Sequence, residues 1–531
     1  KRRRRDADIS DSLCFGVVTT LFPAGKFCGT ICNPVLHPFY FLLSLFHENK
    51  PDKIRAVRRF GDPAAGGMRQ DAETGDAESR GAGQSRFPPP TEYLYPFGDE
   101  PGQITAEIAL SFGPGTDLSA ARIEIPPLKY NKSLLLLLTQ DDCKQAAFST
   151  TWAAINGRPL SDTYFYNAPH LRGGDMPPDT YSFGKALGST DGTGREVRFS
   201  FTTAISPEWD YMDDKAVVRP GFTENYYRFF MRAGLMWDDV TEMLNYGVGI
   251  AFHDVNTLSV DVPDSIRAHF VSSQRIVLDR LAGRGCKMLI EPNGNKAYVA
   301  AAEGYDPIQT IFLQSGGEKL RPFAVNGDLL RTRIERGLWL PAAIPAVIEA
   351  QMARPVEERE AVNIGVHGTD RFWSEMLLWL NNTYGRDGED CLWMPAAEEY
   401  FEYNYLRHHA VVNARVTENT LTLTVEMPGG LYFYYPSLTI NLLGVDPGAC
   451  TAVGGGETVT GLSWGRGRTA DDGAEALMVN FDCRHALVAH AEHFVAVYEA
   501  DPSAANRADA RYFVAMLKDS DCKERLLKRI K

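Results

Sequence analysis

The chain has 531 residues and a formal net charge of −13, with 44% hydrophobic and 11% aromatic residues. This length predicts two or three domains with a sizeable core, and the composition is typical of a globular protein. The excess of negative charge argues against a nucleic-acid partner, and nine cysteines without a CxxC pair argue against a structural zinc ribbon.

The first ninety residues differ in composition from the rest of the chain. A basic run, Lys1–Arg5, precedes two apolar stretches, Leu13–Phe22 and Val35–Phe46. Neither stretch reaches the roughly twenty residues that a membrane span requires, so we expect no integral membrane span. A basic start followed by an apolar stretch is typical of a secretory leader, although no small-residue cleavage site follows Phe46.

The segment Gly61–Pro90 is rich in Gly, Ala, Asp, Arg and Pro, which predicts disorder. We therefore interpret residues 1–90 as an untypical leader joined to a linker, and expect a secreted or periplasmic protein. A translated upstream sequence without function is the alternative. Within residues 91–130, Ile104–Phe112 and Ala121–Ile125 alternate in polarity between Gly and Pro residues, which predicts strands that lead into the next domain.

Five consecutive leucines, Leu134–Leu138, predict a strand that is buried on both faces, as in a parallel sheet or barrel. Shortly after it come two adjacent carboxylates, Asp141 and Asp142. The carboxyl end of a buried parallel strand is where α/β proteins place their reactive groups. Two neighbouring anions are costly unless they share a cation or a proton. A turn in which the pair merely caps the next helix is the alternative.

Three more apolar runs end on polar groups. Val248–Phe252 leads to His253 and Asp254, Asn363–Val366 leads to His367, and Lys287–Ile290 leads to a turn that contains Glu291, Asn293 and Asn295. One histidine in such a position is usually structural. Two histidines and a double aspartate at equivalent strand ends indicate a metal-assisted or acid–base site.

Strands and helices alternate over residues 131–409, which predicts parallel βα units. Further strands are expected at Glu196–Ala204 and Thr310–Leu313, and helices at about 264–281 and 370–384, with Gly283 and Gly385 as C-caps. Residues 410–500 change to period-two alternation, which predicts an antiparallel β-sandwich. A terminal helix is expected within residues 501–531.

The strand ends resemble the motifs of the polysaccharide deacetylase (NodB-homology, carbohydrate esterase family 4) superfamily. The first motif of that superfamily, Thr-Phe-Asp-Asp-Gly at the end of a buried strand, is similar to the segment Thr139–Cys143. The resemblance implies a distorted (β/α)7-type barrel, with Asp141 as general base, Asp142 as a ligand of a divalent metal that is expected to be zinc, and His367 as general acid. The second motif, His-(Ser/Thr)-x-x-His, matches at His253, which the resemblance makes a metal ligand.

The chain departs from the family pattern at several positions. Gln140 replaces an aromatic residue, Cys143 replaces glycine, and Thr257 stands where the second metal histidine would be. Because a catalytic zinc ordinarily has three protein ligands, the third must be Thr257, Asn256, Asp254, water or a residue from elsewhere.

The family's Arg-Pro motif corresponds best to Glu291-Pro292, so we expect the arginine that orients the catalytic aspartate to be absent. Glu291, Asn293 and Asn295 are expected beside the site as substrate-contacting or supporting residues.

We expect a metal-dependent hydrolase that removes acetyl groups from an N- or O-acetylated carbohydrate. One alternative is a catalytically silent carbohydrate-binding protein on the same barrel. The other is a glycoside hydrolase with two carboxylates, for which Glu291 is the candidate partner of Asp141. The sequence decides neither the sugar nor the oligomeric state.

Overall fold

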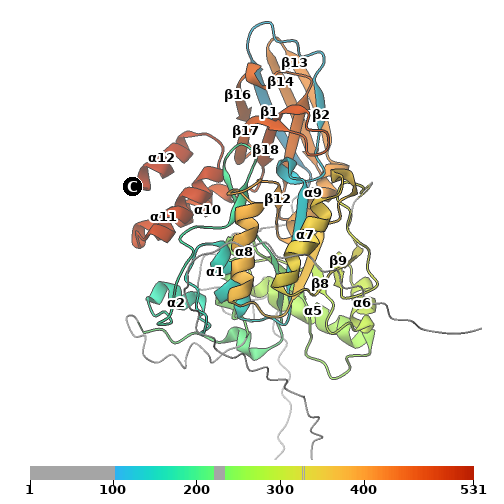
Figure 1. The fold of residues 1–531 in the computed structure, drawn as a ribbon, viewed down its shortest axis with the longest axis vertical. Coiled ribbons are helices and arrows are strands. Elements are labelled where there is room, and N and C mark those ends of the chain that lie inside the picture. Colours follow the sequence, from blue (N-terminus) through green and yellow to red (C-terminus); the bar gives the residue numbers. More distant parts are fainter. Residues whose placement is uncertain (1–101, 220–233, 326, 328, 330) are drawn as a thin grey trace, which may run out of the picture. The chain divides into compact units, whose positions relative to one another are not determined.

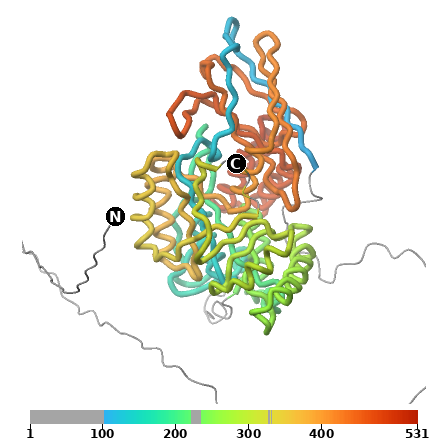
Figure 2. Tube along the Cα trace, turned by 90° about the vertical axis from the view of Figure 1, so that its right-hand side faces the viewer, coloured from blue at the N-terminus to red at the C-terminus, as the bar shows by residue number. Residues whose placement is uncertain are grey.

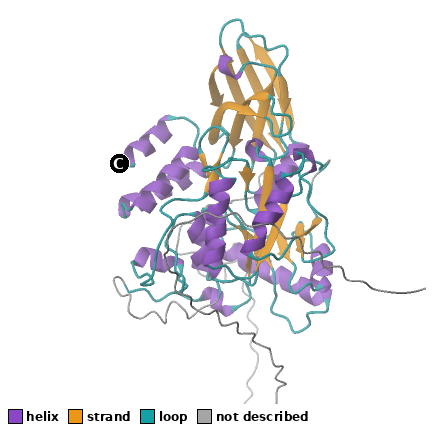
Figure 3. Cartoon of the chain, in the orientation of Figure 1, coloured by secondary structure: helices purple, strands orange, loops and turns teal. Residues whose placement is uncertain are grey.

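The computed structural model describes residues 102–219, 234–325, 327, 329 and 331–531. The chain divides into two units, residues 1–79 and 80–531, and the first lies outside the described residues, as does the expected leader and linker. The described part is a mixed α/β structure in which strands form two blocks and helices surround one of them (Figure 3).

Seven parallel strands form one nearly closed sheet in the order β10-β9-β8-β7-β6-β3-β11. Their bounds are β3 Leu134–Gln140, β6 Thr202–Ile205, β7 Gly249–Phe252, β8 Met288–Ile290, β9 Thr310–Leu313, β10 Thr332–Glu335 and β11 Val362–Val366. The short β12 (Leu392–Trp393) also pairs with β3. A bridge between Gly337 and Ile364 joins the two outer strands, which brings the sheet close to closure.

The leucine strand is buried on both faces, as predicted. Leu134, Leu136 and Leu138 pack in one hydrophobic cluster with the surrounding helices, whereas Leu135 and Leu137 belong to a second cluster with Phe312. The alternation of side chains along a strand explains this division, because successive residues point to opposite faces. A continuous apolar run is therefore what this position requires.

Helices cover the outside of the parallel sheet (Figures 1 and 2). They are α1 Ala153–Ile155, which continues a π-helical turn, α2 Ala168–Gly173, α4 Trp237–Asn245, α5 Pro263–Arg280, α6 Lys296–Glu303, α7 Ile344–Met352 and α8 Arg371–Thr383. Helix α9 (Ala397–His409) packs instead in the second cluster, with Leu135 and Leu137. The two predicted helices correspond to α5 and α8. The Asp370 carboxylate caps α8 by accepting from the Trp373 amide at 3.2 Å, and Gly283, with φ 89°, follows the end of α5.

Two antiparallel sheets share the second hydrophobic cluster, and their orders are β13-β14-β1-β16 and β17-β18-β15-β2. Their strands are β1 Ile104–Phe112, β2 Arg122–Glu124, β13 Val411–Thr417, β14 Thr420–Met427, β15 Ser437–Leu443, β16 Cys450–Gly455, β17 Gly461–Arg468 and β18 Glu475–Asp482. The N-terminal strands β1 and β2 lead into the barrel along the chain, but they pair with β14 and β15.

Two segments differ from the prediction. Glu196–Ala204 is not one strand, because β5 (Glu196–Arg198) forms a hairpin with β4 (Gly188–Thr190) and only β6 joins the barrel. After β18 the chain is helical, with α10 Leu487–Ala500, α11 Ala504–Met516 and α12 Asp521–Arg529 instead of one terminal helix. These helices have a hydrophobic cluster of their own. Among the described residues, no helix is both long and apolar enough to span a membrane.

Candidate metal and acid–base site

The polar residues predicted at strand ends lie at one end of the parallel sheet. Asp141 and Asp142 follow β3, His253 follows β7, Glu291 follows β8 and His367 follows β11. Because these strands run parallel, their carboxyl ends open on the same side of the barrel. Four elements that are distant in sequence thus contribute to one location.

Asp141 is fully buried and is held by Arg336, which follows β10. The Arg336 Nη1 lies 2.5 Å from Oδ1 of Asp141 and Nη2 lies 2.8 Å from Oδ2, and both side chains are 0% exposed. Arg336 Nη1 also donates to the Thr139 hydroxyl at 3.0 Å. A bidentate arginine fixes both the charge and the orientation of a carboxylate.

This ion pair corrects one expectation. The sequence was expected to lack an arginine that orients Asp141, because Glu291-Pro292 occupies the family's Arg-Pro position. The structure supplies an arginine from a different strand end, and the Nη2 of Arg336 also lies 3.5 Å from the Glu291 carbonyl oxygen. The positive charge beside Asp141 is therefore present, but it comes from Arg336 and not from the position of the family's Arg-Pro motif.

The backbone turns sharply after Asp141. Asp142 has φ 60° and Cys143 has φ 50°, a left-handed conformation that costs a non-glycine residue about 1 kcal/mol. Cys143 thus adopts a conformation that glycine, the family's residue at this position, would adopt more easily. The turn leaves Asp142 about one-third exposed, with its Oδ1 3.2 Å from Nε2 of His253.

His253 is oriented by a second hydrogen bond. Its Nδ1 lies 2.8 Å from the carbonyl oxygen of Ile290, so this nitrogen must carry a proton. In a neutral ring the Nε2 then presents a lone pair to Asp142 Oδ1, and two acceptors face each other at 3.2 Å. Such a pair is stable only with a second proton or a cation between them.

The pKa values reflect this need for positive charge. The hydrogen bond from His253, followed by the charges of His253, Lys144 and His367, lowers the pKa of Asp142 to about 2. Burial alone would lower the pKa of His253, but the hydrogen bond to Asp142 and the charges of Asp141 and Asp254 outweigh it and raise that pKa.

Asp254 completes a three-residue cluster. Asp142, His253 and Asp254 each offer one ligand atom, and these atoms lie within 4.8 Å of one another. Burial, together with the negative charges of Asp142 and Asp141, raises the pKa of Asp254. One imidazole nitrogen and two carboxylate oxygens form a donor set that fits a divalent cation, and a cation would relieve the crowding of negative charge.

The remaining predicted residues make other contacts. The Thr257 hydroxyl pairs with that of Ser265 at 3.0 Å and accepts from the Ser259 amide, whereas the exposed His367 stands at the mouth of the site. Buried Glu291 pairs with Lys296 at 2.7 Å and accepts from the Gln314 amide at 2.8 Å.

Two asparagines complete the turn after β8. Asn295 caps α6 by accepting from the Ala297 amide at 2.9 Å, and Asn293 occupies the turn with φ 51°. Both positions have local structural explanations.

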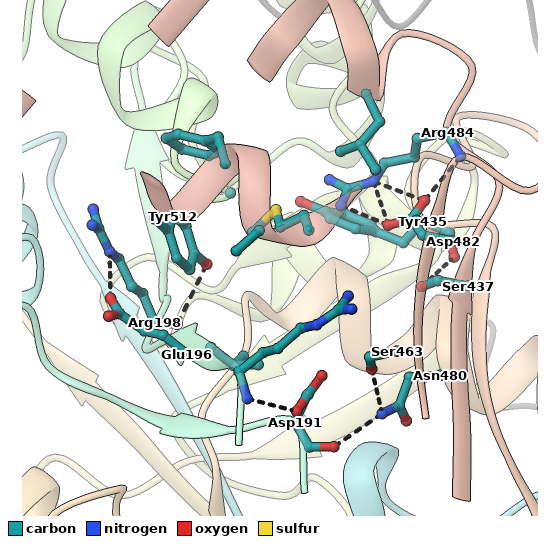
Figure 4. A pocket seen from close by; sticks show the side chains of 18 of the residues that line it. Asp191, Glu196, Arg198, Tyr435, Ser437, Ser463, Asn480, Asp482, Arg484 and Tyr512 are labelled. Carbon is teal, nitrogen blue, oxygen red and sulfur yellow. Dashed lines mark hydrogen bonds and ion pairs between the residues drawn. The ribbon is translucent and has the colours of Figure 1, made fainter. Parts of the chain in front are cut away.

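A separate cavity of about 150 Å³ lies where the barrel, the sheet of β17 and β18, and helices α10 and α11 meet. Its charged groups pair with one another, as in the contacts of Arg198 with Glu196 and of Arg484 with Asp482 (Figure 4). Asn480 donates to Ser463 at 3.0 Å. Because the polar groups satisfy each other, we interpret the cavity as part of the packing between these elements.

His490 lines this cavity and makes stability depend on pH. Burial holds the pKa of His490 well below its usual range, and Nε2 lies 2.9 Å from the Asn245 carbonyl oxygen. The unfolded chain takes up a proton on His490 near pH 6.5 and the folded protein does not. The free energy of unfolding therefore falls as the pH drops below about 6.5, by up to about 1.4 kcal/mol per pH unit.

Urea unfolding between pH 7 and 5 should show a shallower loss of stability for His490→Gln than for the wild type. The same substitution at exposed His485 is the control, and equal slopes for wild type and His490→Gln would contradict the prediction.

Comparison with protein-family models gives one match that covers most of the chain. A family model described as "putative polysaccharide deacetylase" matches residues 116–531, which is most of the chain. The match begins after β1 and includes the barrel, the other strands of the antiparallel sheets and the C-terminal helices. A search of curated proteins finds no significant match.

Proposed function

The chain belongs to the putative polysaccharide deacetylase family, and from this premise we propose that it removes acetyl groups from an N- or O-acetylated carbohydrate by metal-dependent hydrolysis. The observation that carries the proposal is the cluster of Asp142, His253 and Asp254 next to an aspartate held by a buried arginine. A metal site and a fixed carboxylate are the two elements that metal-assisted hydrolysis of an acyl group uses.

In this proposal Asp142, His253 and Asp254 hold the metal, which we take to be zinc. When bound, the metal would polarise the acetyl carbonyl and lower the pKa of the attacking water. The Ile290 carbonyl keeps the Nδ1 of His253 protonated, so Nε2 is the ligand atom. Asp254 is then the third protein ligand of the metal, which the sequence left open among Thr257, Asn256, Asp254 and other groups.

Asp141 accepts the proton of the attacking water. Both of its oxygens bind Arg336, and each keeps a second lone pair for this proton. His367, exposed at the mouth, donates a proton to the departing amine or alcohol. A backbone N–H that follows the acid pair stabilises the oxyanion of the tetrahedral intermediate.

One observation favours a second candidate, a catalytically silent carbohydrate-binding protein. Asp141 is 0% exposed, so a water molecule reaches it only if the surrounding residues move. The glycoside hydrolase alternative receives no such support, because the Glu291 carboxylate is paired with Lys296.

Acetate release distinguishes the candidates. The purified protein would be incubated with a panel of N- and O-acetylated glycans, with and without a chelator. Chelator-sensitive release of acetate is expected. Binding of glycans without release of acetate from any of them would support the silent carbohydrate-binding protein. Release of free sugar without acetate would support the glycoside hydrolase.

The ligand assignment gives a separate prediction. Asp254→Ala should weaken zinc binding at least about tenfold, because it removes one of three protein ligands. Isothermal titration of the metal-free protein measures this affinity directly. Thr257→Ala is the matched control on the same loop and should bind zinc like the wild type, since its hydroxyl contacts Ser265. Equal losses in both variants, or a loss only in Thr257→Ala, would refute the assignment of Asp254.

A further inference from the structure

Most of the exposed large apolar side chains lie on segments that follow the carboxyl ends of the barrel strands. Of the eleven such residues in the described part of the chain, seven follow the carboxyl ends of β6, β7, β10 and β11. We call these seven the apolar rim, and they are Val217, Leu258, Val260, Val262, Leu338, Leu340 and Phe372. Leu258 is fully exposed, and Leu340 and Phe372 are 77% and 68% exposed.

The apolar rim belongs to the same loops as the candidate site. Leu258 lies on the loop that begins with His253 and Asp254, and Leu338 and Leu340 follow Arg336 closely. Phe372 stands in the first turn of α8, shortly after His367. Whatever covers the rim is therefore brought to the metal and acid–base residues.

The composition of the rim indicates what covers it. Single exposed apolar residues are ordinary, but several on the same side of a barrel indicate an interaction site. Six of its seven members are the aliphatic residues Val and Leu, which lack the π face on which sugar rings stack. Aliphatic side chains gain free energy instead when hydrocarbon replaces water around them.

The charge of the chain restricts the kind of lipid. With a net charge of −13, an anionic membrane surface would repel the protein. The cation beside Phe372 is already paired, because Arg371 lies 2.8 Å from both Asp162 and Glu375. A neutral, zwitterionic lipid surface is the one that suits these observations.

We propose that the apolar rim docks on a neutral lipid surface and that the substrate is an acetylated sugar carried by a lipid. The substrate assignment rests on the proposed deacetylation, whereas docking depends only on the exposed side chains. The rim would insert among the lipid headgroups and present the sugar to the strand ends.

Sedimentation with phosphatidylcholine vesicles tests the docking. We expect the wild type to bind, and a Leu258→Ser/Leu340→Ser/Phe372→Ser variant to bind at least about tenfold more weakly. The matched control is Val411→Ser/Val416→Ser/Leu527→Ser, which alters three exposed apolar residues outside the rim and should bind like the wild type. Thermal unfolding checks that each variant is folded.

Three measurements separate docking from catalysis. Asp141→Asn should bind vesicles like the wild type. The rim variant should lose activity on an acetylated glycolipid in vesicles while retaining it on a soluble acetylated sugar. Vesicle binding without acetate release from any substrate would overturn the proposed function and leave the docking surface standing.

Other outcomes overturn the docking itself. These are acetate release by a protein that binds no vesicles, equal vesicle binding by the rim and control variants, and a wild-type dimer that the rim substitutions dissociate. Rim-dependent binding to an insoluble polysaccharide without vesicle binding would also exclude a lipid surface.

Discussion

Asparagine in place of Asp141 is expected to lower kcat for acetate release by about a thousandfold, within the range that a general base contributes. Asparagine has the same shape but cannot accept the proton of the attacking water. The measurement is acetate release at saturating substrate, with zinc affinity determined in parallel. Zinc binding should be retained, because the proposed ligands are Asp142, His253 and Asp254.

Arg336→Lys separates the positioning of Asp141 from substrate binding. Lysine keeps the positive charge but replaces two fixed N–H donors, at 2.5 and 2.8 Å, by one flexible ammonium group. Because both Nη atoms of Arg336 are engaged by Asp141 and Thr139, this side chain does not bind the substrate, so kcat should fall and KM should stay nearly unchanged. A change confined to KM in Arg336→Lys would contradict the positioning role of Arg336. An Asp141→Asn enzyme with wild-type kcat would remove Asp141 from the mechanism.

The strand ends that carry Asp141, His253 and His367 could be predicted because each one combines two strong local signals, an apolar run and a polar group directly after it. The apolar run Leu134–Leu138 can be satisfied only by burial on both faces, and the acid pair after it must lie where that burial ends. The same pattern locates His253 after β7 and His367 after β11. Where both signals are present, the sequence is sufficient to find the strand and its end.

Arg336 could not be found in this way, because its strand lacks the first signal. The segment Thr332–Glu335 contains one apolar residue, Ile334, and is only partly buried, so it does not stand out as a barrel strand. Its place in the sheet depends on pairing with Thr310–Leu313, which is a contact between distant segments. The pairing of β1 with β14 escaped prediction for the same reason.

Alanine in place of Glu402 is expected to destabilise the protein by about 3–5 kcal/mol, as is typical when one partner of a buried ion pair is removed. Glu402 on α9 is 0% exposed and forms an ion pair with Lys287, which precedes β8. The same carboxylate accepts from the backbone amides of Tyr434 and Tyr435 at 2.7 and 2.6 Å. Alanine would leave a buried ammonium group and two buried amides without their acceptor.

Urea unfolding of three variants tests whether the buried charge is the cause. Glu375→Ala, which breaks an exposed pair with Arg371 on α8, should cost less than about 0.5 kcal/mol. The double variant Lys287→Met/Glu402→Gln should cost less than Glu402→Ala, because it leaves no unpaired charge and keeps one acceptor for the amides. If the double variant were the less stable of the two, the attraction between Lys287 and Glu402 would itself hold α9 to the barrel. If Glu402→Ala cost no more than Glu375→Ala, the connection between α9, β8 and the segment before β15 would depend on hydrophobic packing alone.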